Sequence, residues 1–316
     1  MRRALVTGGA GLIGSNIIKE LNNQGHNDII VCDVLGNDNK YKNLIGLDFH
    51  DYIEYDKSIF ESNLFSDITH IYHLGACSST TEEDMSYLYE VNTNLTKKLA
   101  QISLEKNIRF VYASSAATYG NGSTGMMDTD DILHFKPLNK YGFSKQLFDL
   151  HAKKNKLFKK ITGLKYFNIF GPGEEHKGDM RSLISKSISQ IADTGCINLF
   201  KSYNNNYKDG EQKRDFLYVK DAAKITIDLS MDSTAVGLFN VGSGTAHSWN
   251  YLAKCIFDCL NIPYCVNYID MPDEIKKTYQ YYTKANISKL YSFFPKLKIT
   301  PLHTAVNDYI NNYFKK

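Results

Sequence analysis

Short apolar runs alternate with amphipathic stretches along the first half of the chain. The runs predict β-strands over residues 4–7, 29–33, 70–74, 109–114 and 162–168. Between them, apolar residues recur every three or four positions, as helices require, at Ile13, Ile17, Ile18 and Leu21 and again at Leu88, Val91, Leu95 and Leu99. Such alternation is typical of βαβ units. We therefore predict an α/β fold with a Rossmann-like, doubly wound parallel sheet.

The pattern changes near Gly171, where loops rich in Gly, Lys, Asn and Asp begin and where polar residues 203–212 predict an exposed excursion. Residues 215–229 resume a strand-then-helix pattern. An apolar stripe after Pro301 predicts a docked terminal helix. We predict a dinucleotide-binding domain over 1–170, re-entered by 214–246. A smaller interleaved α/β substrate-binding lobe takes 171–213 and 247–316.

Composition narrows the class of protein. The 316 residues are 43% hydrophobic, and the 37 basic and 34 acidic residues form no long single-sign block, so neither a nucleic acid nor a membrane is expected as partner. The apolar run 4–6 is too short for an export signal, and no stretch approaches the roughly 20 apolar residues of a membrane span. We expect a cytoplasmic protein. The six cysteines lack zinc-site spacing, which predicts reduced thiols and no metal.

A glycine-rich turn follows the first predicted strand. Gly8, Gly11 and Gly14 form a GxxGxxG pattern that leads into a helical stretch, the context that a dinucleotide-binding fingerprint requires. Such glycines permit a tight turn, close approach of amides to a pyrophosphate, and close packing of helix on strand. A glycine cluster alone is also compatible with an ordinary strand-to-helix turn. With Asp33 at the end of the second strand, the pattern predicts a dinucleotide fold.

The choice between NAD and NADP stays open in the sequence. Asp33 lies 19 positions after Gly14, matching the offset of the carboxylate that binds the ribose 2′-hydroxyl of NAD. That carboxylate would repel a 2′-phosphate, whereas Lys40 and Lys57 could neutralise one. The two lysines are equally explained as solvated loop charges.

Candidate chemistry centres on Tyr141 and Lys145, four positions apart in the predicted helix 140–154 and so on one helical face. A nearby ammonium lowers the pKa of a phenol, which suits acid–base work near neutral pH. The same spacing also describes an ordinary surface pair. The segment YASSAATYG at 112–120, with Ser115 before Tyr141, makes the pattern more specific.

This combination resembles the extended short-chain dehydrogenase/reductase superfamily. The resemblance implies that Ser115 hydrogen-bonds the reacting sugar hydroxyl, that Tyr141 takes its proton, and that Lys145 holds the nicotinamide ribose and acidifies Tyr141. Sugar dehydratases of the superfamily carry two carboxylates where this chain has Ala116 and Ala117. Because neither alanine can protonate a leaving hydroxide, dehydration is excluded.

Four further strings resemble one family of nucleotide-sugar enzymes, the ADP-L-glycero-D-manno-heptose 6-epimerases. They are GACSSTTE at 75–82, KPLNKYGFSK at 136–145, GP with EEHKGDM at 174–180, and KRDFLYV at 213–219, and the likeness extends through Tyr279-Gln280. The resemblance implies oxidation at C6 of ADP-D-glycero-D-manno-heptose by tightly bound NADP, a 6-ketone, and return of the hydride to the opposite face. It further implies a role in lipopolysaccharide core synthesis and a homopentamer.

Site residues are carried over from this resemblance position by position. Tyr141 is the first acid–base candidate, and Lys177 is the second, although it could instead be a loop ammonium that holds diphosphate. The implied cofactor contacts are Gly8, Gly11, Leu12, Ile13, Gly14, Asp33, Val34, Lys40, Lys57, Leu74, Gly75, Ala76, Cys77, Ser78, Asn92, Lys145, Ile169 and Lys177. The implied substrate contacts are Asn168, Asp179, Lys186, Phe200, Lys201, Ser202, Arg214 and Tyr279.

Some positions depart from the family pattern or allow another reading. Asp179 and Lys186 stand where better-known members have serine and histidine, which leaves a related heptose derivative open as substrate. Arg214 suits a nucleotide diphosphate, or else an ion pair with its neighbour Asp215. Alternative functions are a UDP-hexose 4-epimerase or sugar reductase, and a redox-sensing binding protein that has lost its chemistry.

Overall fold

The computed structural model describes residues 1–61, 63–122, 125–277 and 279–314, and within these ranges seven parallel strands form the central sheet. The strands lie in the order β10-β6-β5-β4-β1-β2-β3. Their bounds are β1 Arg3–Thr7, β2 Ile29–Asp33, β3 Asp51–Glu54, β4 Ile68–His73, β5 Arg109–Ser115, β6 Thr162–Tyr166 and β10 Gly237–Val241. This architecture confirms the prediction of a doubly wound α/β fold.

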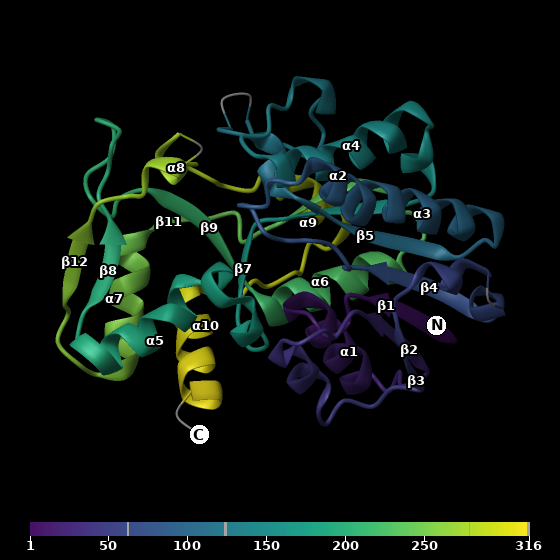
Figure 1. Ribbon diagram of the computed structural model, residues 1–316, viewed down its shortest axis with the longest axis horizontal. Helices are drawn as coiled ribbons and strands as arrows, with labels where there is room; N and C mark the ends of the chain where they lie inside the picture. Colours follow the sequence, from purple (N-terminus) through teal and green to yellow (C-terminus); the bar gives the residue numbers. More distant parts are fainter. Residues whose placement is uncertain (62, 123–124, 278, 315–316) are drawn as a thin grey trace.

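Helices cover both faces of this sheet (Figure 1). Helices α1 (Leu12–Asn23) and α6 (Val219–Met231) pack together on one face, and α3 (Leu95–Glu105) and α4 (Lys140–Lys154) cover the other. The chain runs outward from β1 to β3 and then returns to β4, which pairs with β1. In open α/β sheets, ligands bind at the carboxyl ends of the strands where the order reverses. Here that crevice lies between β1 and β4.

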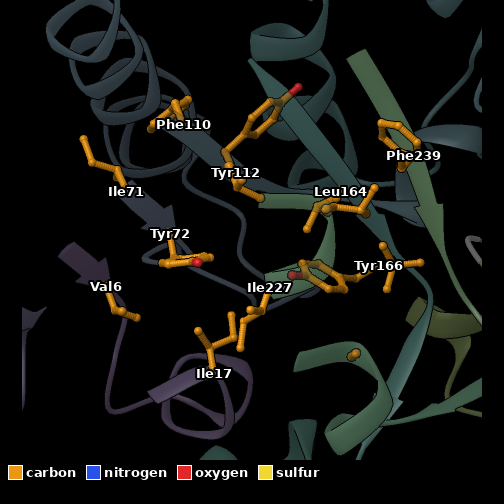
Figure 2. Close-up of a cluster of buried hydrophobic side chains, with 14 of the residues drawn as sticks. Val6, Ile17, Ile71, Tyr72, Phe110, Tyr112, Leu164, Tyr166, Ile227 and Phe239 are labelled. Atoms are coloured by element: carbon orange, nitrogen blue, oxygen red, sulfur yellow. The ribbon is translucent and has the colours of Figure 1, made fainter. Parts of the chain in front are cut away.

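The main core lies between the sheet and its helices, where side chains of successive strands stack. Val6 and Leu164 are fully buried there, and Ile17 and Ile227 approach them from α1 and α6, while Ile71 is fully buried on the opposite face of the sheet (Figure 2). Each buried aliphatic side chain of this size contributes about 1.5–3 kcal/mol to the free energy of folding. This packing fixes the strand ends that line the crevice.

A second core lies beyond the crevice and belongs to the smaller elements at the left of Figure 1. Strands β7 (Asn168–Phe170), β9 (Lys213–Tyr218) and β11 (Ala246–Ser248) form one small sheet, and β8 (Ile197–Phe200) pairs with β12 (Val266–Ile269) in another. Apolar residues of α5, α7 and α10 fill this second core. The helical bounds are α5 Leu183–Thr194, α7 Trp249–Leu260, α8 Asp273–Lys276, α9 Ser288–Phe293 and α10 Leu302–Tyr309.

Several predicted elements have different bounds in the structure. The strand predicted over 162–168 breaks at Phe167, because β6 joins the central sheet and β7 pairs with β9 instead. The apolar stripe from 88 to 99 runs through α2 (Met85–Leu88), a π-helical turn η4 (Tyr89–Asn94) and α3. The 203–212 excursion is only partly exposed, since Gly210 and Gln212 are buried.

The prediction that all six cysteines are free thiols is wrong for one pair. Cys196 and Cys265 form a disulfide at the start of strands β8 and β12, while Cys32, Cys77, Cys255 and Cys259 are free. The two bonded residues are 69 positions apart, so their spacing carries no signal of pairing. Within the described ranges, none of the helices combines the length and apolar character that crossing a membrane requires.

Candidate active site

A cleft of about 660 Å³ opens at the carboxyl ends of β1, β4 and β5. It brings together most of the residues that the sequence singles out, from several segments between Gly8 and Lys177. Its lining includes the predicted residues Gly8, Gly11, Leu12, Ile13, Gly14, Asp33, Lys40, Leu74, Gly75, Ala76, Cys77, Ser78, Ser115, Tyr141, Lys145, Asn168, Ile169 and Lys177. The candidate catalytic and cofactor-binding groups therefore share one cavity.

The glycine turn forms one end of this cleft. Gly8 has a φ of 67°, in the left-handed region that favours glycine. A Cβ on Gly14 would lie 2.2 Å from the carbonyl oxygen of Gly8, so only glycine lets α1 start this close to β1. Gly11 is the N-cap of α1, and a helix N-terminus attracts an anion. The turn therefore fits the pyrophosphate of a dinucleotide.

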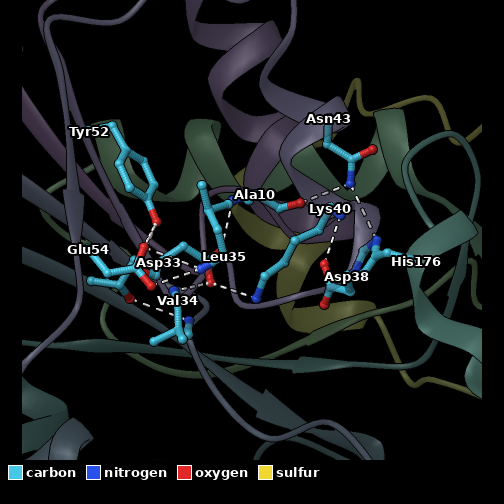
Figure 3. A network of polar contacts seen from close by, with 12 residues as sticks. Ala10, Asp33, Val34, Leu35, Asp38, Lys40, Asn43, Tyr52, Glu54 and His176 are labelled. Carbon is cyan, nitrogen blue, oxygen red and sulfur yellow. Dashed lines mark hydrogen bonds and ion pairs between the residues drawn. The ribbon is translucent and has the colours of Figure 1, made fainter.

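Asp33, at the end of β2, is the centre of a polar network beside the turn (Figure 3). Its carboxylate accepts hydrogen bonds from the amides of Ala10 at 2.9 Å and Val34 at 2.8 Å. The ammonium of Lys40 lies 3.1 Å from the same carboxylate, and the Lys40 side chain is 17% exposed. Lys40 thus neutralises Asp33 and weakens the repulsion that the carboxylate would exert on a phosphate.

Asn43 links the turn to a distant loop, and the sequence did not point to it. Its side-chain amide donates to the carbonyl oxygens of Ala10 at 2.8 Å and Gly173 at 2.9 Å, and approaches the ring of His176 (Figure 3). Asn43 therefore joins the cofactor end of the cleft to the loop that carries Lys177.

Three predicted cofactor contacts lie outside the lining of the cleft. Lys57 pairs with Glu90 at 3.2 Å, and its side chain is 73% exposed, as expected for a solvated loop charge. Val34 is half exposed. Asn92 is buried, accepts from the amide of Cys77 at 2.9 Å and donates to its carbonyl at 3.0 Å, so it holds the cleft wall from behind.

The predicted catalytic residues meet where β5 and α4 pack together. Ser115 ends β5 and lines the same cleft as Tyr141, which lies on α4. One turn further along α4, the Lys145 ammonium donates to the carbonyl oxygen of Ala113 at 3.0 Å. Helix α4 begins at the predicted residue because Asn139 caps it, accepting from the amide of Gly142 at 2.8 Å. The predicted group is thus assembled on two rigid elements.

The pKa of Tyr141 does not shift in the direction that the sequence suggested. Burial raises it above its ordinary value, and the Ser115 hydroxyl opposes this only in part. Lys145 is not among the groups that shift this pKa, and its ammonium donates to the Ala113 carbonyl. Burial in turn lowers the pKa of Lys145 to about 8. Tyr141 is therefore a neutral phenol in this structure, while Lys145 titrates near neutral pH.

Lys177 lines the cleft from the loop η8 (Glu175–Met180), a different segment from the helix α4 that carries Tyr141 and Lys145. Burial lowers the pKa of Lys177, and the negative charge of Glu174 partly opposes this. Glu174 is 1% exposed and accepts from the Ser182 hydroxyl at 2.7 Å and the Gly171 amide at 3.3 Å. Glu174 thus anchors the loop to the start of α5 and places Lys177 at the cleft.

A second cavity of about 390 Å³ continues from the first, and Asn168, Ile169 and Met180 line both. Of the predicted substrate contacts, Asn168, Lys186, Phe200 and Tyr279 line it. Its other walls are largely apolar and come from α5, β8, β9 and α7. An elongated molecule can therefore extend from the catalytic residues into this cavity.

Arg214 does not line the second cavity itself, but its side chain packs against two aromatic residues that do. Its guanidinium is 5.0 Å from the ring centre of Tyr279 and 5.8 Å from that of Trp249. The alternative ion pair with Asp215 does not form, because that carboxylate accepts from the amides of Ser243, Gly244 and Ala285. Arg214 donates instead to the carbonyl oxygen of Lys213 at 2.9 Å.

Three other predicted substrate contacts lie outside the lining of both cavities. Asp179 is exposed on η8. Lys201 pairs with Asp270 at 3.2 Å, and the amide of Ser202 donates to Asp209 at 2.6 Å. These two residues follow Phe200 directly, so they flank the second cavity without lining it.

Some residues of the two cavities carried no recognisable sequence signal. Thr283 lines the first cavity, and Trp249 and Arg181 line the second. Each depends on contacts between distant segments, which a local pattern does not reveal. Asn139 and Gln280 also line the first cavity, and they lie within the quoted strings KPLNKYGFSK and Tyr279-Gln280, from which they could have been selected.

Comparisons with known proteins agree with this geometry. Residues 4–242 match the model of the NAD dependent epimerase/dehydratase family. The ADP-L-glycero-D-manno-heptose-6-epimerase of Nitratidesulfovibrio vulgaris is 42% identical over 98% of this chain and 97% of its own length. Among solved structures, the epimerase of that name from Helicobacter pylori has a TM-score of 0.82 at 26% identity, covering 98% of this chain and 96% of that one.

Fold similarity alone does not separate neighbouring activities. A UDP-N-acetylglucosamine 4-epimerase from Methanobrevibacter ruminantium, solved with UDP-N-acetylmuramic acid, also has a TM-score of 0.82, at 25% identity, covering 99% of this chain and 98% of that one. The higher sequence identity to the heptose epimerases, over nearly the full length of the chain, distinguishes this group from the 4-epimerases.

Proposed function

This chain belongs to the NAD dependent epimerase/dehydratase family, within which it groups with the ADP-L-glycero-D-manno-heptose-6-epimerases, and from this premise we propose its reaction. The protein inverts C6 of the heptose in ADP-D-glycero-D-manno-heptose and yields the L-glycero epimer. The observation that carries the proposal is the meeting of Ser115, Tyr141, Lys145 and Lys177 in one cleft that continues into a second cavity. The product would supply activated heptose for lipopolysaccharide core.

The reaction begins at the C6 hydroxyl of the sugar. Ser115 and Tyr141 hold this hydroxyl, and Tyr141, reacting as its phenolate, accepts the hydroxyl proton as the C–H bond at C6 breaks and a 6-ketone forms. A bound nicotinamide dinucleotide supplies the reversible hydride acceptor for this step. Because the phenol of Tyr141 is favoured by burial, the positive charge of Lys145 is needed to stabilise the phenolate at that moment.

Inversion requires that the ketone be reduced on its other face. Lys177 approaches the cleft from η8 and Tyr141 from α4, so the two groups serve different orientations of C6. Lys177 donates the proton to the ketone oxygen after the sugar has turned. The net redox change is zero, and the two groups are restored when Tyr141 releases a proton to solvent and Lys177 takes one up.

We further propose that the cofactor is NADP and that it stays tightly bound. The turn Gly8–Gly14 would hold the pyrophosphate, and Lys145 the nicotinamide ribose. The ion pair between Lys40 and Asp33 supports NADP, because the ammonium keeps further donors for a 2′-phosphate and cancels the charge of Asp33. NAD stays possible, since the Asp33 carboxylate can accept from a ribose hydroxyl.

The nucleotide and its diphosphate would occupy the second cavity beside Arg214. Arg214 would bind the diphosphate, and Phe200 and Tyr279 would flank the nucleoside. The boundaries given above for the dinucleotide-binding domain and the interleaved lobe stay predictions. A homopentamer and a cytoplasmic location stay predictions.

The experiment is incubation of purified protein with ADP-D-glycero-D-manno-heptose, with the configuration at C6 followed by NMR. We expect the L-glycero product, no steady change in nicotinamide absorbance, and retention of a deuterium label placed at C6. Tyr141→Phe should lower kcat at least about 100-fold, because it removes the proton acceptor. Absence of L-glycero product from cofactor-loaded protein would overturn the assignment, and turnover of UDP-galactose instead would favour the 4-epimerase alternative.

A further inference from the structure

A buried ion pair lies directly behind the catalytic face of α4. Asp149 and Lys165 are 2.7 Å apart, and both side chains are 0% exposed. Asp149 stands eight positions after Tyr141 and four after Lys145, so the three side chains follow one face of the helix. The pair does not line the cleft and has no part in the reaction as described above.

The carboxylate of Asp149 bonds α4 to the strand that carries Ser115. It accepts from the Tyr112 phenol at 2.7 Å and from the Ser114 hydroxyl at 2.8 Å, both on β5. The Lys145–Ala113 hydrogen bond joins the same two elements nearer the cleft. Hydrogen bonds at two successive turns of α4 therefore set its register against β5.

Lys165 is held as firmly from the other side. It lies on β6, directly beside Ser114 in the sheet register, and donates to the Thr118 hydroxyl at 2.7 Å. Its ammonium is 5.1 Å and 5.3 Å from the ring centres of Tyr119 and Phe135. Burying such a pair costs several kcal/mol of desolvation per ion, and an apolar pair of similar volume often serves stability equally well. Stability alone therefore does not account for it.

We propose that Asp149 is a positioning residue for the catalytic pair, which fixes the register of Tyr141 and keeps the neighbouring Lys145 charged. This inference rests on the proposed function for its catalytic consequence. The groups that face Lys145 are Asp149 on α4, His73 at the end of β4, and Cys77 in the following loop. Asp149 is the carboxylate among these three groups, and its negative charge opposes the loss of the Lys145 proton that burial favours.

The test measures the pKa of Lys145 directly, so it does not depend on turnover. Protein labelled with ¹³C at the lysine ε-carbons is titrated by NMR, and the Lys145 signal is assigned by its loss in Lys145→Arg. In Asp149→Asn we expect the pKa of Lys145 to fall by about one unit, the usual effect of a partner charge at this separation. Tyr112→Phe is the matched control, because it removes one hydrogen bond to Asp149 and no charge. Its Lys145 should titrate as in the natural protein.

The activity then gives a second readout. Because Lys145 must be protonated for catalysis, the decline of kcat at high pH should begin about one pH unit lower in Asp149→Asn. At pH values above both Lys145 pKa values, kcat of the variant should therefore be about tenfold lower than that of the natural protein. KM should stay unchanged. A Lys145 pKa that is equal in Asp149→Asn and the natural protein, or that shifts as far in Tyr112→Phe, overturns the proposal. If the heptose is not turned over at all, the proposed function fails and the NMR titration still decides the role of Asp149.

A double variant covers the case in which Asp149→Asn fails to fold. Asp149→Leu with Lys165→Met replaces the pair by apolar residues, a change that buried pairs often tolerate. We expect the double variant to fold. Because it also removes the positive charge of Lys165, we expect its Lys145 pKa to be lowered, but by less than in Asp149→Asn. A natural pKa in the folded double variant would also overturn the proposal.

Discussion

Substitution of Gly14 by alanine has two opposing effects on the free energy of unfolding. Gly14 is the third residue of α1, where alanine would favour the helix by about 1 kcal/mol relative to glycine. The added Cβ would lie 2.2 Å from the carbonyl oxygen of Gly8, which is roughly 1 Å short of ordinary contact. Relieving such an overlap in packed backbone costs about 3 kcal/mol. We therefore expect a net loss of about 2 kcal/mol in the free energy of unfolding.

The same displacement should weaken cofactor binding. Moving the start of α1 away from β1 misplaces the amides that would face the pyrophosphate, and each lost hydrogen bond to a charged group is worth about 1.5–3 kcal/mol. We expect the dissociation constant for the dinucleotide to rise at least about tenfold. Thermal unfolding followed by circular dichroism, and calorimetric titration with the cofactor, measure the two effects separately. The expected fall in Tm is about 4 °C.

Gly11→Ala is the matched control in the same turn. Gly11 has a φ of −75°, which any residue adopts, and its Cβ would lie 3.2 Å from the Gly8 oxygen. We expect the Tm of this variant to stay within about 1 °C of the natural protein. A Gly14→Ala protein that is as stable as the natural one, or more so, would show that helix propensity outweighs the close approach and would refute the reasoning.

Three further predictions concern charge. Lys40→Met should raise the Kd of NADP more than about tenfold and that of NAD much less, since it removes the ammonium that would pair with a 2′-phosphate. Calorimetric titration measures both constants, and an equal loss of affinity for the two cofactors would contradict this prediction. Glu174→Gln should lower the pKa of Lys177, so the decline of kcat with rising pH should begin at lower pH; an unmoved profile would count against it. Burial lowers the pKa of His73 to about 3, so the native state binds fewer protons than the unfolded chain. The contribution of His73 to the free energy of unfolding is complete above about pH 6.5 and is lost as the pH falls toward 3. About 2 kcal/mol of it is lost at pH 5. Urea unfolding should therefore show that His73→Asn loses less stability between about pH 7 and pH 5 than the natural protein does.

The sequence predicts best where one local rule decides the structure. Helix α4 has the predicted bounds, because Asn139 caps it and its residues favour a helix. The glycine turn was equally recognisable, since spacing and context suffice. Strand β3 was not predicted, because Asp51–Glu54 is short, charged at both ends and only half buried at the sheet edge.

Other features depend on partners far apart in the chain. Glu174 bonds to Ser182, and Asp149 takes its charge partner from β6, so neither contact leaves a periodic pattern. The break at Phe167 follows from the competition of two sheets for one segment. The expected acidification of Tyr141 by Lys145 assumed a contact that spacing alone cannot guarantee.

The chain has a single tryptophan, and the fold places it beside the second cavity. The indole of Trp249 meets Phe216 edge to face, donates to the Tyr279 hydroxyl at 3.0 Å and lies near the Arg214 guanidinium. A ligand anion that draws Arg214 away would change the polarity and quenching around this one indole. The protein thus carries its own optical probe, so that its intrinsic fluorescence reports occupancy of the cavity without a label.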